Sequence, residues 1–238
     1  MRPTTYTVLL ALLLYACSGL PKLQKYQAQI PCIGAVGHDQ STLFKKAFQK
    51  VSAPHLNDAV PLSLQKQRFD ARTYQKYTNT LDVKDPKTEV VPTDSTQAPM
   101  PYYTLGISDF VGLRSQFNRE ENAALKNYMV MDDALQVVRQ ISFVAPKEIQ
   151  DRLADTNHYF LTDSQDGLML EVHGPSGKTQ IDMIAFNIFD FETADICWSK
   201  NQYGQMQVAT FLVDGGPCPG NTQKIPRKLQ EDTNHLKF

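Results

Sequence analysis

The sequence predicts an α+β fold, in which an antiparallel β-meander forms a sheet and one or two helices pack on one face of it. Short segments rich in β-branched and aromatic residues follow one another in the second half of the chain, with turn residues between them. No helical pattern separates these segments beyond residue 158, so consecutive strands are expected to pair antiparallel. Hydrophobic residues make up 42% of the 238 residues, which is enough for a packed core.

The strands are expected between clear turn signals, in which Gly stands beside Asp, Pro or Tyr. Those signals are Asp166-Gly167, Gly174-Pro175-Ser176-Gly177, Tyr203-Gly204 and Gly215-Gly216-Pro217. The predicted strands span residues 102–107, 134–145, 158–162, 168–173, 179–189, 194–198 and 207–214. Turns this short join antiparallel neighbours directly.

Two helices are expected in the same part of the chain. Asn118, followed by Glu121 three positions later, is typical of the capping box that begins a helix. Pro146 fits the first turn of a short helix over residues 146–153, because a helix start does not need the N–H that proline lacks.

The domain organisation is predicted from composition and spacing. Within residues 41–52, Phe44, Phe48 and Val51 follow helical spacing, so the N-terminal part is expected to be mostly helical. Four prolines among Thr, Asp, Ser and Gln then mark a linker. The expected order is a signal peptide (1–16), a lipidated tether (17–31), a small, mostly helical segment (32–83), a Pro-rich linker (84–101), the main α+β domain (102–217) and a polar tail (218–238).

The first 16 residues have the features of a secretory signal peptide. Arg2 and the amino terminus supply positive charge, and residues 8–16 form an apolar run. This run is too short to cross a bilayer, which takes roughly 20 apolar residues. The chain is therefore expected to be exported.

The end of that run resembles the lipobox of bacterial lipoproteins. Leu14-Tyr15-Ala16-Cys17 places an aliphatic residue three positions before the cysteine and a small residue directly before it, although Tyr15 is larger than the residue usual there. The resemblance covers only this N-terminal segment. It implies cleavage ahead of Cys17 and acylation of Cys17, typically with palmitate, which would hold the protein stably at a membrane.

The residue after the cysteine bears on the destination. Ser18 resembles the residue found in lipoproteins sorted to the outer membrane, so the expected location is that membrane, facing the periplasm or the cell surface. Residues 18–31 are polar and contain two prolines, as a tether would. The alternative is ordinary cleavage near Ser18 or Gly19, which would release a soluble secreted protein.

Cysteine usage predicts one disulfide, because an exported protein meets an oxidising compartment. If Cys17 carries lipid, Cys32, Cys197 and Cys218 remain. Cys197 and Cys218 are the preferred pair because they are closest in sequence. A plain hairpin would nevertheless hold them farther apart than the roughly 7 Å that a disulfide spans, so Cys32 is kept as the alternative partner of either one.

No sequence motif indicates catalysis, a cofactor or a metal. Residues 174–179 end like a phosphate-binding loop but lack its first glycine and lead into a strand, so a hairpin turn is expected. The five histidines show no i,i+4 pair of the kind that zinc proteases use. A formal charge of -1 argues against general nucleic-acid binding.

The leading expectation is a non-catalytic binding, scaffold or envelope-assembly component held at a membrane by its lipid. One alternative is a cell-envelope hydrolase, in which His158, His173 and Asp163 would converge in the fold. Another is a carrier of a small apolar ligand, which would need a cavity among the aromatic residues between Phe189 and Trp198.

Overall fold

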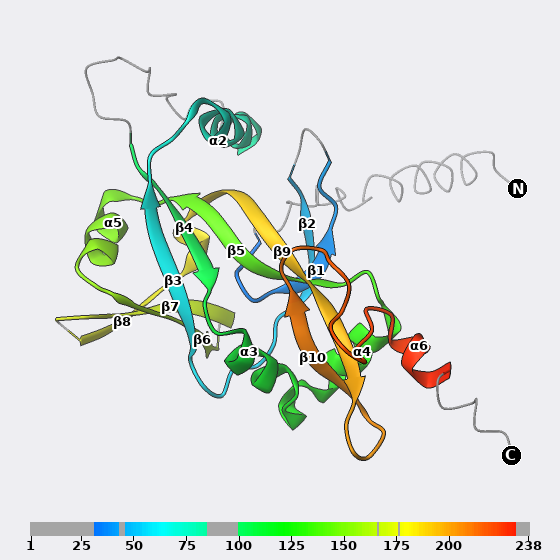
Figure 1. The fold of residues 1–238 in the computed structure, drawn as a ribbon. Coiled ribbons are helices and arrows are strands. Elements are labelled where there is room, and N and C mark those ends of the chain that lie inside the picture. Colours follow the sequence, from blue (N-terminus) through cyan, green and yellow to red (C-terminus); the bar gives the residue numbers. More distant parts are fainter. Residues whose placement is uncertain (1–30, 43–45, 85–99, 166, 176, 232–238) are drawn as a thin grey trace, which may run out of the picture.

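A large twisted sheet with short helices around it forms the described part of the chain (Figure 1). The computed structural model describes residues 31–42, 46–84, 100–165, 167–175 and 177–231. All strand pairs in the sheet are antiparallel. The predicted α+β class with an antiparallel sheet is confirmed.

The strands agree with the predicted ones through most of the second half of the chain. They are β1 (Val36–Asp39), β2 (Phe48–Ser52), β3 (Val60–Gln67), β4 (Tyr102–Ile107), β5 (Gln136–Val144), β6 (His158–Ser164), β7 (Gly167–Gly174), β8 (Gly177–Ile181), β9 (Asn187–Lys200) and β10 (Met206–Leu212). The strand predicted over residues 179–189 is wrong, because the Asp182 side chain accepts the N–H of Ile184 and turns the chain into a single 3-10 turn. Its two ends belong to β8 and β9.

The helices lie mostly between strands. They are α2 (Ala71–Lys84), α3 (Phe110–Phe117), α4 (Ala123–Met131), α5 (Lys147–Ala154) and α6 (Pro226–Glu231), with 3-10 turns η2 (Glu120–Asn122) and η3 (Met183–Ala185). Pro146 precedes α5 directly, which confirms the short helix predicted there. The predicted capping box is wrong, since Asn118 ends α3 and α4 begins only after Asn122.

The order of strands in the sheet is β10-β9-β5-β4-β3-β6-β7-β8. The hairpins β6–β7, β7–β8 and β9–β10 follow the chain as a meander does. β3 lies between β4 and β6 and joins the two halves of the sheet. β1 pairs with the first residues of β5, and β4 pairs with the later residues of β5. β9 pairs with β5 along its opposite edge, so β1 and β4 share one edge of β5.

The prediction of a mostly helical segment over residues 32–83 is wrong in its first part. Phe48 to Ser52, expected to be helical, form a strand that pairs with β1. This pairing buries Phe48 against the Phe191 ring, with 5.6 Å between the ring centroids, and leaves Val51 exposed. Only α2 is helical in this region, and β3 is a central strand of the same sheet as residues 102–217.

Hydrophobic side chains pack on both faces of the sheet. In β4, Tyr103 and Leu105 belong to the main core, which also contains Leu113 and Phe117 of α3. Tyr102 points to the opposite face, since successive strand residues alternate. There it packs with Phe69, Tyr77, Leu81 and Phe189, so α2 covers this second face.

The segment after β10 is a strap along β9. Cys218 forms a disulfide with Cys197 in the buried part of β9, with 5.8 Å between the Cα atoms. Gln223 then pairs with Trp198 as in a sheet, and Lys224 Nζ donates to Asp195 at 2.5 Å. Residues 218–231 of the predicted polar tail are held by these contacts and end in α6. Gly215, between β10 and Cys218, adopts a positive φ angle that favours glycine and turns the chain back toward Cys197.

Candidate functional site

The residues of the hydrolase hypothesis are only partly brought together. His158 and His173 are direct cross-strand partners in β6 and β7. Asp163 lies at the other end of β6, opposite Leu168, and its carboxylate pairs with His55 Nδ1 at 2.8 Å. The three side chains therefore form no single site in this structure.

His173 has its own partners on the β7–β8 hairpin. Its Nε2 lies 2.6 Å from Glu171 Oε1, and its ring contacts the Phe160 ring. The hydrogen bond from His173 holds the pKa of Glu171 below its ordinary value, with a smaller contribution from Lys178. Because these groups already satisfy one another, they stabilise the hairpin.

The aromatic residues of the carrier hypothesis pack against other rings. Phe189 lies in the cluster beneath α2, Phe191 contacts Phe48, and Trp198 is only 1% exposed. Phe186 stacks on Phe143, with 4.1 Å between the ring centroids. Side chains therefore fill the region in which an apolar ligand would have to bind.

Cys32 is a free thiol, and the alternative disulfides through it are not formed. Its Sγ faces the backbone oxygen of Leu168 at 3.8 Å. Burial raises the pKa of the thiol to about 12, so almost none of it is the reactive thiolate at neutral pH. Cys32 packs against the main core.

In the segments that the structure describes, no helix has the length and apolar character needed to cross a bilayer. Nor does any group of three or more His, Cys, Asp or Glu side chains there have an arrangement that could hold a metal ion. The predicted signal peptide, Cys17 and nearly all of the predicted tether and linker lie outside the described residues.

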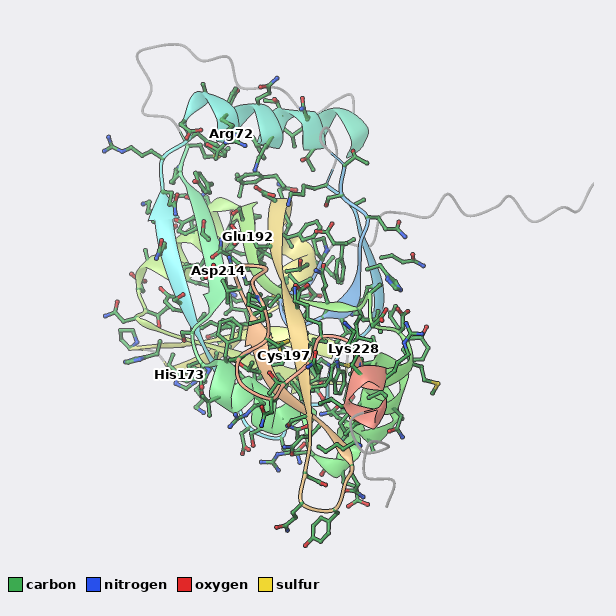
Figure 2. All side chains as sticks on the ribbon, turned by 45° about the vertical axis from the view of Figure 1, so that its right-hand side comes forward. Arg72, His173, Glu192, Cys197, Asp214 and Lys228 are labelled. Atoms are coloured by element: carbon green, nitrogen blue, oxygen red, sulfur yellow. A yellow bond between two sulfur atoms is a disulfide. The ribbon has the colours of Figure 1, made fainter. Side chains whose placement is uncertain are left out.

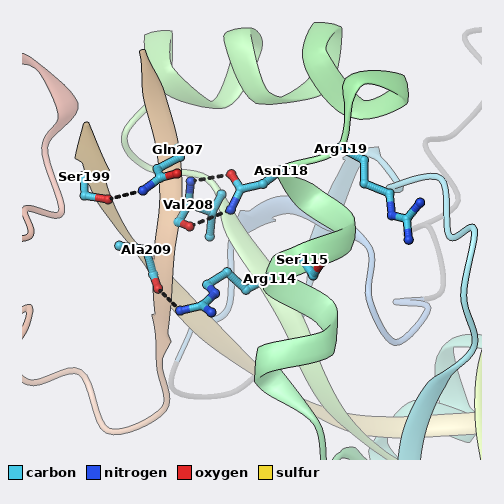
Figure 3. Close-up of a pocket in the computed structure, with 8 residues that line it drawn as sticks. All are labelled: Arg114, Ser115, Asn118, Arg119, Ser199, Gln207, Val208 and Ala209. Carbon is cyan, nitrogen blue, oxygen red and sulfur yellow. Dashed lines mark hydrogen bonds between the residues drawn. The ribbon is translucent and has the colours of Figure 1, made fainter. Parts of the chain in front are cut away.

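An open groove of about 590 Å³ lies between α3 and the β9–β10 hairpin and is called the α3–β10 groove (Figure 3). Its volume falls in the range of small-ligand sites, roughly 300–1,000 Å³. The wall on the side of α3 consists of Arg114, Ser115, Asn118 and Arg119, and the strand wall consists of Ser199, Gln207, Val208 and Ala209. Every lining side chain except those of Val208 and Ala209 is polar or positively charged.

Asn118 fixes the distance between the two walls. Its side-chain amide donates to the Val208 oxygen at 2.8 Å, and its oxygen accepts from the Val208 N–H at 2.9 Å. The amide thus takes the place of a neighbouring strand on the outer edge of β10. Phe110 and Phe117 of α3 both contact the Phe211 ring of β10, which holds the helix in position.

The two arginines of the groove have different surroundings. Arg119 forms an ion pair with Asp58, which also accepts from the Gln116 amide at 3.0 Å. Arg114 donates one Nη1–H to the Ala209 backbone oxygen at 3.2 Å. Within the described segments, no carboxylate lies within ion-pair distance of Arg114. Its charge and remaining donors face the groove and solvent.

The strand wall adds neutral hydrogen-bonding groups. Gln207 donates through Nε2 to Ser199 Oγ at 3.1 Å, which leaves the Gln207 amide oxygen as an acceptor and the Ser199 hydroxyl as a donor. Ser115 is exposed on the opposite wall, one residue from Arg114. The groove can therefore hold a polar ligand by hydrogen bonds from two sides.

Sequence reasoning missed this groove. Arg114 and Asn118 are one helical turn apart, so both can face the same strand, but nothing in the sequence shows that this strand is β10, about 90 residues later.

No family model matches the chain, and no curated protein and no solved structure matches it either.

Proposed function

We propose that this protein is a lipid-anchored, non-catalytic binding component of a bacterial cell envelope. Its anchor is Cys17, acylated after removal of residues 1–16. Ser18 favours the outer membrane as its destination. Residues 18–31 link the anchor to Ile33, where the chain enters the core.

The observation that carries the binding role is the α3–β10 groove. Its walls are held together by the Asn118–Val208 hydrogen bonds and by the contacts of α3 with Phe211. Groups on both walls still have free hydrogen-bonding capacity. A preformed polar groove with spare donors and acceptors suits recognition of a ligand, because preorganised groups lose little conformational freedom on binding.

The anchor is tested by labelling the full-length protein with a clickable palmitate analogue in a bacterial host. Wild-type protein is expected to carry the label and to sediment with membranes. Cys17→Ser is expected to lose the label. The matched control Cys32→Ala is expected to keep it, because Cys32 packs against the core of the folded domain and is not the proposed acylation site. If wild-type protein were processed and exported but carried no label, the lipid anchor would be refuted. A soluble secreted binding protein would then be the favoured hypothesis.

A further inference from the structure

The ligand class of the groove is indicated by the charge of its walls. Arg114 and Arg119 both line the groove, and no lining residue is acidic. Asp58, which does not line the groove, neutralises the charge of Arg119 in an ion pair. Among the described residues, Arg114 is hydrogen-bonded only to the neutral backbone oxygen of Ala209. An arginine oriented in this way, with donors to spare, is well suited to a carboxylate or phosphate group.

The other lining groups indicate what kind of molecule bears the carboxylate or phosphate group. Ser115 and Ser199 offer hydroxyls and Gln207 offers a free amide oxygen, so donors and acceptors are mixed around Arg114. Sugar hydroxyls are also both donors and acceptors, and they fit such a mixture. No aromatic or acidic side chain contributes to either wall.

A peptide that adds as a strand is disfavoured here. Strand addition needs free N–H and C=O groups along the outer edge of β10. The Asn118 side chain already hydrogen-bonds the N–H and the C=O of Val208, and Arg114 hydrogen-bonds the C=O of Ala209. The edge of β10 is therefore closed at the point where the groove lies.

We infer that the α3–β10 groove binds an acidic saccharide, with Arg114 contacting its carboxylate or phosphate group and Ser115, Ser199 and Gln207 bonding its hydroxyls. This inference rests on the proposed role of the groove as a binding site. It names the ligand class and the residue that selects it.

The test uses full-length protein purified in a non-ionic detergent and two trisaccharides of equal length. Trigalacturonate carries carboxylates and maltotriose carries none, and binding of each is measured by calorimetry at low salt. Wild-type protein is expected to bind trigalacturonate at least tenfold more tightly than maltotriose. The difference is expected to shrink in high salt, because screening weakens the contact with exposed Arg114.

Three variants assign that binding to the groove. Arg114→Gln is expected to bind the two trisaccharides equally. Ser115→Asp, which places a carboxylate beside Arg114 at an exposed position, is expected to have the same effect without removing any structural hydrogen bond. Arg72→Gln, on α2 at the other end of the molecule (Figure 2), is expected to bind as wild type does.

Three outcomes would overturn the inference. Equal affinity of wild-type protein for both trisaccharides would remove the acidic ligand, and an equal loss in Arg72→Gln would show non-specific charge attraction. Tighter binding of hexaglutamate than of trigalacturonate would replace the saccharide with an acidic peptide. Palmitate labelling is independent of these results, so the anchor and the ligand class can fail separately.

Discussion

Reduction of the Cys197–Cys218 disulfide should cost this domain a predictable share of its stability. The bond closes a loop with a sequence separation of 21 residues. For a loop of that length, the chain-entropy relation gives about 11 cal/mol/K, or about 3.3 kcal/mol at 25 °C. The free energy of unfolding of reduced protein is therefore expected to be about 3.3 kcal/mol below that of oxidised protein.

Urea unfolding measures this difference with two probes. Far-UV circular dichroism follows the sheet, and the fluorescence of Trp198, the single tryptophan, follows the strap beside the disulfide. Coincident transitions would justify a two-state analysis of both forms. The double variant Cys197→Ala/Cys218→Ala is expected to be at least as destabilised as the reduced wild type and to be insensitive to reductant. A loss below about 1 kcal/mol on reduction would refute the loop-entropy reasoning.

Three further predictions concern single side chains. Cys32 is expected to resist iodoacetamide at pH 8 in the native protein, because burial raises the pKa of its thiol to about 12, and to react once urea unfolds the chain. Mass spectrometry would detect the modified thiol, and rapid alkylation of the native protein would contradict the prediction. Asp190→Asn is expected to lower the free energy of unfolding by about 1–2 kcal/mol, since this largely buried carboxylate joins Lys46, ahead of β2, to Lys76 of α2. Glu192→Gln, at a more exposed carboxylate, should cost less in the same urea titration. The pKa of Glu171 is lowered by its hydrogen bond from His173, so its stabilisation is present above its ordinary pKa of 4.5 and is lost as the pH falls through the folded value. Glu171→Gln should thus destabilise more at pH 7 than at pH 3, and equal destabilisation at both pH values would exclude this linkage.

The sequence predicts strands well where local signals are strong. β4 was predicted over the residues that form it, and the hairpins around Gly167 and Gly177 follow from turn residues whose positive φ angles favour glycine. These features depend on neighbours in sequence. The α+β class followed from them.

Features that depend on distant pairing could not be predicted. Phe48 and Val51 fit a helix by spacing, but pairing with β1 makes the segment a strand. The position of β3 between β4 and β6 is likewise decided by contacts across more than 30 residues. Asn118 has the residue type of a helix cap, and only the folded chain shows that its amide binds the edge of β10. The Cys197–Cys218 pair was preferred from sequence, but the strap that makes it possible was not foreseen.

The entry of the N-terminal chain into the sheet has a mechanical consequence. Ile33, Ala35 and Val36 are fully buried, and backbone hydrogen bonds link Gly34 and Ala35 to Val138 of β5 at 2.8 and 2.9 Å. A pulling force applied ahead of residue 31 would therefore act at once on the interior of the sheet and not on a peripheral loop. Tension on a membrane tether would be resisted by the same hydrogen bonds and buried side chains that stabilise the fold, so the domain would extend only after β1 had been pulled away from β5.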